Sequence, residues 1–172
     1  GELVAASGLN QSELMFSKEL RAIDLFDSSP YLAKSSPLFD GGSGLVSNID
    51  DYSKFAEMLL NGGVLNEVRI LSEASVNLMS RNHLVDTILK DGAAFGLNGV
   101  GFGLTVGVVM DSGLAGSYSS DGEFFWGGAA STIFWVDKKN NITATMMTQY
   151  MPSDRFPIRE ELKTLLYSSL SN

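Results

Sequence analysis

The second half of the chain carries short apolar segments in which large and small side chains alternate, and this pattern restricts the fold more than any other feature. Residues 102–110 place Phe, Leu, Val, Val and Met at every second position, which predicts a strand with one bulky face. Two more strands are predicted over residues 132–136 and 142–148. They flank a turn at residues 137–141 whose Asp and Asn residues tolerate positive φ. Together these segments predict an antiparallel meander.

The middle of the chain has a helical pattern instead. Ser47 can cap a helix with Asp50 three residues later, and Gly62-Gly63 should end it. Its apolar positions recur at helical spacing: Tyr52, Phe55, Ala56, Leu59 and Leu60. This helix is therefore predicted to bury one face.

A second, shorter helix is expected after a hairpin centred on Asn66-Glu67. Ser72 can cap this helix, Val76 and Met79 should point inward, and His83 is expected to close it. A lone histidine in the last turn of a helix more often complements the dipole or satisfies a carbonyl group than takes part in catalysis. We therefore interpret His83 as structural.

The chain should end in a helix after Pro157 that covers one face of the sheet. Its expected inner side is Ile158, Leu162, Leu165, Leu166 and Leu170. Residues 86–98 and 111–121 are predicted to be loops. The expected fold class is α+β in a single unit, with an irregular lead-in (1–40), a helical part (41–98) and an antiparallel sheet with a C-terminal helix (99–172).

Composition excludes several classes of function. With 20 acidic and 12 basic residues the net charge is −8, so the surface should repel nucleic acid and anionic lipid. The chain has no cysteine and one histidine, which argues against a zinc site, and no metal or other cofactor is expected. No apolar run approaches the roughly 20 residues that cross a bilayer. No secretory signal pattern is present, and the compartment, periplasmic or cytoplasmic, is left open.

Glycine-rich segments suggest nucleotide-binding or nucleophile motifs that the sequence does not complete. After Gly41-Gly42-Ser43-Gly44 no Gly-Lys-Ser/Thr follows, and Leu45 stands where a G-x-S-x-G elbow needs glycine. The pattern G-x-G-x-x-G fails at Leu104 and at Val106. These segments therefore predict neither a phosphate loop nor a dinucleotide site.

The segment Trp126-Gly127-Gly128 is the best candidate for a functional edge. Consecutive glycines weaken a strand, so they suggest that another group approaches the backbone closely. A substrate would satisfy this expectation. A bulge or kink without any ligand would satisfy it equally well.

Four collinear segments, 41–63, 70–84, 100–108 and 126–137, resemble the C-terminal half of class C β-lactamase-like serine hydrolases. This largely bacterial group includes β-lactamases, DD-peptidases of the penicillin-binding type and carboxylesterases. The resemblance covers residues 38–170 and does not select one of these activities.

The resemblance implies roles for particular residues. Trp126-Gly127-Gly128 matches the family's Lys-Thr-Gly motif, and the backbone N–H of Ala129 takes the place of an oxyanion-hole donor. Tryptophan in place of lysine removes a cation that would bind a carboxylate, which favours esters. The family's Ser-x-x-Lys and Tyr-x-Asn motifs do not occur in residues 1–172. Lys163-Thr164-Leu165 resembles Lys-Thr-Gly only superficially, because its helical period places it in the last helix.

The resemblance therefore implies the C-terminal part of a serine hydrolase that acts on an ester or, less favoured, a β-lactam. The alternative is a non-catalytic binding or interaction module of the same fold. The chain alone should be inactive, with its N-terminal half or a second copy of the chain as its partner. Residues 142–148 carry no charge and no proline, so this strand is expected to have a neighbour on both sides.

Overall fold

A five-stranded antiparallel sheet forms the centre of the computed structural model, which describes residues 45–85, 88, 97–153 and 155–170. The strand order is β3-β4-β5-β6-β7, so each strand pairs with its neighbour in sequence and the predicted meander is confirmed. The strands are β3 (Val100–Phe102), β4 (Gly107–Val109), β5 (Phe124–Gly127), β6 (Ile133–Asp137) and β7 (Ile142–Met146).

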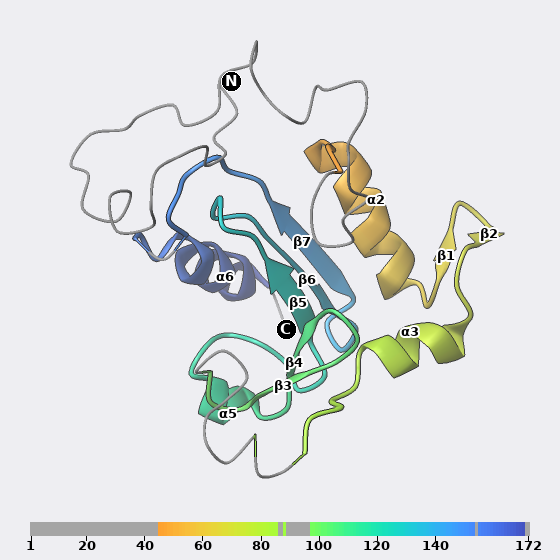
Figure 1. Ribbon diagram of the computed structural model, residues 1–172, viewed down its shortest axis with the longest axis horizontal. Helices are drawn as coiled ribbons and strands as arrows, with labels where there is room; N and C mark the ends of the chain where they lie inside the picture. The colour runs from red at the N-terminus through yellow and green to blue at the C-terminus, as the bar shows by residue number, and fades with distance from the viewer. Residues whose placement is uncertain (1–44, 86–87, 89–96, 154, 171–172) are drawn as a thin grey trace, which may run out of the picture.

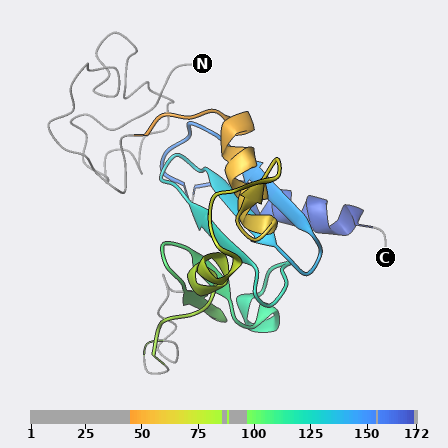
Figure 2. The same cartoon turned by 90° about the vertical axis from the view of Figure 1, so that its right-hand side faces the viewer.

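Helices cover both faces of this sheet, which gives three layers (Figures 1 and 2). Helix α2 (Ile49–Leu60) packs on one face against β6 and β7, and α6 (Ile158–Ser169) lies on the other. The α+β class, with a helical segment, a meander and a covering C-terminal helix, is therefore confirmed. No helix in the described part of the chain has the length and apolar character needed to cross a membrane.

Alternation along β5 and β6 separates an apolar face from a mixed face. Phe124, Phe134 and Val136 point toward α2 and join the core that contains Ala56 and Leu59. Burying one such large side chain contributes about 1.5–3 kcal/mol. The side chains between them on the two strands point toward α6.

Helix α2 begins one residue later than predicted. Its N-cap is Asn48, whose Oδ1 accepts a hydrogen bond from the Asp51 N–H at 2.9 Å, while Nδ2 of Asn48 donates to the Asp51 carboxylate at 2.9 Å. Ser47 lies outside the cap because asparagine at the next position satisfies the orphan N–H itself. The predicted end is confirmed. Gly62 and Gly63 both have positive φ, and their N–H groups bond back to the last turn of the helix.

The hairpin and the second helix also follow the prediction. Strands β1 (Val64–Leu65) and β2 (Val68–Arg69) pair around Asn66 and Glu67, which both have positive φ. The Ser72 side chain caps α3 (Glu73–Met79), and Val76 is fully buried.

His83 does not close α3, because the helix ends at Met79 with Ser80 as its C-cap. The imidazole Nε2 nevertheless lies 2.9 Å from the Leu78 carbonyl oxygen, and the His83 N–H donates to Phe102 O at 2.8 Å. The structural interpretation of this residue is therefore consistent with its contacts.

The single strand predicted over residues 102–110 is wrong. The segment is a hairpin in which β3 pairs with β4, Phe102 opposite Gly107. Thr105 has a φ of 71°, and Leu104 N–H donates to Met79 O at 3.0 Å. A Cβ on Gly103 would lie 2.0 Å from the same Met79 oxygen, so contact with the end of α3 turns the chain where alternation alone predicts continuity.

Two other local expectations need correction. Residues 111–121 contain a short helix, α5 (Ser112–Ala115), capped by Asp111. Leu165 and Leu170 do not face the sheet, since they are 69% and 39% exposed. The lead-in 1–40, the Gly41–Gly44 motif and most of the loop 86–98 lie outside the described residues.

Candidate functional site

The Trp126–Ala129 segment begins in β5 and continues into the turn that follows it. Trp126 is 38% exposed, and its ring packs edge to face against the ring of Phe102 at 5.5 Å between centroids. The side chain lies on the face opposite to α6, because Gly127, the next residue, faces Arg159 of that helix. The tryptophan therefore exposes part of an apolar ring on the side of the sheet opposite to α6.

A tight turn over residues 128–131 holds the end of β5. The Ser131 N–H donates to Gly128 O at 3.1 Å, and the Gly128 N–H donates to Thr132 O at 3.1 Å. Ser131 is fully buried, with a φ of 62°, and its hydroxyl donates to the Tyr150 carbonyl at 2.7 Å. The hydroxyl of this serine is therefore buried and hydrogen-bonded, so it is not placed to act as a nucleophile.

The two glycines of this segment do mark a close approach to the backbone. A Cβ on Gly127 would lie 3.0 Å from Nη2 of Arg159, and a Cβ on Gly128 would lie 2.5 Å from Oγ1 of Thr132. The approaching groups thus belong to the chain itself, so the glycines are explained without a substrate. A role of this edge in substrate binding remains a prediction.

Ala129 is the residue of this segment whose backbone is most available. It is exposed, it is the second residue of the turn, and its N–H makes no hydrogen bond to any residue that the structure describes. Backbone donors of this kind usually find a partner. This N–H, in the turn that follows Trp126, is therefore available to a hydrogen-bond acceptor such as a carbonyl oxygen.

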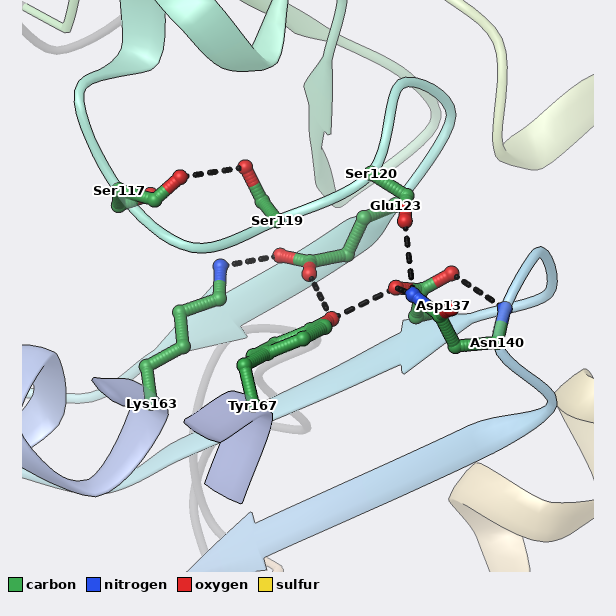
Figure 3. A network of polar contacts seen from close by, with 8 residues as sticks. All are labelled: Ser117, Ser119, Ser120, Glu123, Asp137, Asn140, Lys163 and Tyr167. Atoms are coloured by element: carbon green, nitrogen blue, oxygen red, sulfur yellow. Dashed lines mark hydrogen bonds and ion pairs between the residues drawn. The ribbon is translucent and has the colours of Figure 1, made fainter. Parts of the chain in front are cut away.

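On the α6 face, two buried carboxylates and two partly buried side chains form a polar cluster, the Glu123 cluster: Glu123, Asp137, Lys163 and Tyr167 (Figure 3). Lys163 and Tyr167 point from α6 toward the two carboxylates on the sheet, where Lys163 forms an ion pair with Glu123. The Tyr167 hydroxyl lies 2.7 Å from Oε2 of Glu123 and 2.7 Å from Oδ2 of Asp137.

The two carboxylates of the cluster have opposite pKa shifts. Burial raises the pKa of Glu123, even though Lys163 and Tyr167 favour the charged form. Burial also acts to raise the pKa of Asp137, but hydrogen bonds from Tyr167 and Asn140 outweigh it, so this pKa lies below its usual value. Burial and the two neighbouring carboxylates raise the pKa of Tyr167. The cluster therefore favours an ionised Asp137 and makes Glu123 easier to protonate than an ordinary glutamate.

The sequence prediction missed this cluster. Arg159, Lys163 and Tyr167 recur every four residues, so they share one face of α6. That face packs on the sheet, which is why Leu165 is exposed. The spacing of three polar residues along a helix otherwise rich in leucine was the available signal. The interpretation of Lys163 as part of the last helix is confirmed. In the described part of the chain, no three His, Cys, Asp or Glu side chains are grouped as metal ligands would be.

Comparison with known proteins gives a family match and several relatives. The family model described as Beta-lactamase matches residues 6–167. Two curated Mycobacterium tuberculosis proteins, "Uncharacterized protein MT1414" and "Protein Rv1367c", are each 35% identical to this chain over 119 residues. The match covers 66% of this chain and 29% of each relative.

Solved structures share the fold. One is "EstCE1, a hydrolase with promiscuous acyltransferase activity", with a TM-score of 0.62 and 25% identity over 74% of this chain and 31% of that one. Another is unliganded simvastatin synthase (LovD) from Aspergillus terreus, with a TM-score of 0.60 and 21% identity over 74% of this chain and 36% of that one. The chain thus spans less than two thirds of the length of these relatives.

Proposed function

Because this chain belongs to the Beta-lactamase family, we propose that it is the C-terminal part of a serine hydrolase that works through an acyl-enzyme. Esters are the favoured substrates, ahead of β-lactams and other amides. The chain supplies the strand and turn that hold the substrate carbonyl, and a different segment supplies the nucleophile. The observation that carries the proposal is the N–H of the exposed residue Ala129, which lies in the turn after Trp126 and makes no hydrogen bond to a residue that the structure describes.

The chemistry of acyl transfer requires such a donor. When a serine oxygen attacks an ester carbonyl, negative charge develops on the carbonyl oxygen, and fixed N–H groups stabilise that charge in the transition state. Ala129 needs only its backbone for this task. One donor of this kind lowers the barrier by about 3 kcal/mol, and a second N–H would come from the nucleophilic serine itself.

The nucleophile is assigned to polypeptide outside residues 1–172. No Ser-x-x-Lys motif occurs in this sequence, and the hydroxyl of Ser131 is committed to a carbonyl. The chain also spans 29% of the curated relatives it matches, which leaves room in a protein of that size for the missing serine, lysine and tyrosine. We call this chain combined with an N-terminal polypeptide that carries those residues the assembled hydrolase.

Trp126 supports esters over substrates with a carboxylate. The indole places an apolar wall where the resembled motif has a cation, and Phe102 supports it from the neighbouring hairpin. A carboxylate brought against this wall would lose hydration without gaining a partner. A neutral acyl group would bury apolar area there.

The test compares the chain alone with the assembled hydrolase, using short-chain p-nitrophenyl esters and nitrocefin. We expect no turnover by the chain alone and ester hydrolysis by the assembled hydrolase. Ser43→Ala, Ser131→Ala and His83→Ala variants of the chain serve as controls. Turnover that survives all three would refute the assignment of the nucleophile to another segment, and its loss in one would identify a different nucleophile. Saturable ester binding without turnover by the assembled hydrolase would favour a binding module.

A further inference from the structure

We propose that Arg159 is a positioning residue that aims the Ala129 N–H at the substrate carbonyl and strengthens it as a donor. This inference rests on the proposed function, because it assigns a purpose to the same N–H. Arg159 lies in the first turn of α6, on the side of the sheet opposite to Trp126. Its guanidinium therefore contacts the backbone of the site from the α6 side of the sheet.

The contact joins one guanidinium nitrogen to the first residue of the turn and to the residue that follows the turn. Nη2 of Arg159 donates to Gly128 O at 2.6 Å and to Thr132 O at 2.8 Å. This nitrogen carries two hydrogens, so both bonds form at once. Gly128 and Thr132 are also joined by a backbone bond of 3.1 Å. The guanidinium thus fixes the turn that carries Ala129.

Peptide geometry transmits this contact to the other side. The Gly128 carbonyl and the Ala129 N–H belong to one planar unit, and in a trans peptide they point in opposite directions. The cis bond found among the described residues is Met151–Pro152, so the Gly128–Ala129 bond is trans. A guanidinium that holds the carbonyl toward α6 therefore turns the N–H away from α6, to the side on which Trp126 lies.

The positive charge of Arg159 also strengthens its hydrogen bond to Gly128 O. A hydrogen bond from a cation is stronger than one between neutral groups, and hydrogen bonds that share a peptide unit polarise one another. Drawing electron density to the Gly128 oxygen makes the Ala129 N–H a better donor to a developing oxyanion. An uncharged side chain of the same shape would keep some of the orientation but not this polarisation.

The Glu123 cluster explains why the guanidinium is held in place. Lys163 and Tyr167 follow Arg159 by one and two helical turns on the same face of α6. Their contacts with Glu123 and Asp137 anchor the helix to the sheet. Arg159 therefore lies on a helix that the polar contacts of Lys163 and Tyr167 hold against the sheet.

Nuclear magnetic resonance of the 172-residue chain tests the inference without any catalysis. In the wild-type chain we expect a scalar coupling across the hydrogen bond from Nη2 of Arg159 to the Gly128 carbonyl carbon, and rapid solvent exchange of the Ala129 N–H. In Arg159→Gln the Gly128 carbonyl and Ala129 amide resonances should shift. Arg159→Lys should shift them less, because it keeps the charge.

Arg69→Gln is the matched control, because Arg69 also donates to two carbonyl oxygens, Gly62 O and Leu71 O, in a different hairpin. It should leave the Ala129 resonances unchanged. Absence of the coupling in the wild-type chain, or an Ala129 N–H protected from exchange, would overturn the inference even if the glutamine variant does not fold. Unchanged Gly128 and Ala129 resonances in a folded Arg159→Gln variant would do the same.

Kinetics of the assembled hydrolase separates this inference from the proposed function. We expect Arg159→Gln to lower kcat for a neutral ester by about 10- to 100-fold, part of the loss seen when an oxyanion donor is removed, with little change in KM and partial recovery in Arg159→Lys. Equal loss in Arg69→Gln would indicate general destabilisation and overturn the inference. If the resonances shift as expected but the assembled hydrolase is inactive, the proposed function fails and the structural role of Arg159 stands.

Discussion

Trp126 is the residue at which the chain differs most in chemistry from the Lys-Thr-Gly motif it resembles. Its ring is partly exposed on the side of β5 opposite to α6 and packs against Phe102. We predict that Trp126→Lys in the assembled hydrolase shifts preference from neutral esters toward substrates that carry a carboxylate. The ratio of their kcat/KM values should change by about 10- to 100-fold, the worth of one charge-assisted hydrogen bond.

The control for this change is Trp126→Phe, which keeps an apolar ring and should keep the ester preference. Both variants are assayed on a matched pair of neutral and carboxylate-bearing esters. An unchanged ratio in Trp126→Lys would mean that Trp126 is a packing residue and that its match to Lys-Thr-Gly has no functional content.

Glu123 and Asp137 should make the free energy of unfolding depend on pH in opposite directions. The folded pKa of Glu123 is raised, so its contribution to stability is complete below about pH 4, near the pKa of an unfolded glutamate, and is lost as the pH rises through the folded pKa. Glu123→Gln removes this loss. The unfolding free energy of the variant, relative to wild type, should therefore rise as the pH increases from about 4.

Asp137 gives the reverse sign, because its folded pKa is lowered. Its contribution is present above about pH 4, near the unfolded pKa, and is lost as the pH falls through the folded pKa. The free energy of unfolding of Asp137→Asn should therefore approach the wild-type value as the pH falls. Urea unfolding of the variants at a series of pH values measures both trends, and slopes of the same sign would contradict the assignment.

Among the elements, α6 connects the polar cluster to the candidate site. We predict that Tyr167→Phe destabilises the chain by about 1–3 kcal/mol, since it removes the hydroxyl hydrogen-bonded to both buried carboxylates. Leu165→Ala, at an exposed position of the same helix, should change stability by less than about 0.5 kcal/mol. Urea denaturation midpoints compare the two, and equal effects would show that the cluster does not anchor the helix.

Elements with complete local signals were predictable, and those set by distant contacts were not. Three local features behave as expected because the residues that form them lie next to one another in the sequence. They are the helix end at Gly62-Gly63, the cap at Ser72 and the hairpin turn at Asn66-Glu67. The hairpin at residues 102–110 was missed because Met79, distant in sequence, accepts the hydrogen bond that helps turn the chain. The inner face of α6 was misassigned because its partners, Glu123 and Asp137, lie on strands whose register is not visible in the sequence.

The same distinction holds for the candidate site. The Trp126–Ala129 segment was proposed from its paired glycines and its family resemblance. The family match over residues 6–167 confirms the resemblance, and the role of the segment stays a prediction. Arg159 was not identifiable, because only the packing of α6 brings a guanidinium to the Gly128 carbonyl. A contact of this kind depends on tertiary structure, and local spacing does not encode it.

In the molecule as a whole, β7 is the last strand of the sheet that the structure describes. Among the described residues this strand pairs only with β6, and it has neither the charges nor the proline that protect an edge. We predict that it pairs with the N-terminal polypeptide or with a second copy of the chain. Light scattering together with a crystal structure tests this, and a monomer with residues 142–146 open to solvent would contradict it.

In the proposed function, residues 1–172 provide an oxyanion donor and not the nucleophile. Covalent labelling by a fluorophosphonate, followed by peptide mass spectrometry, tests this assignment, because the reagent forms a bond to an activated serine and the peptide identifies which residue carries it. The prediction is a single labelled serine in the assembled hydrolase, outside residues 1–172, and no label on the 172-residue chain alone. A labelled serine within the chain, whether Ser43, Ser131 or another, would contradict the claim.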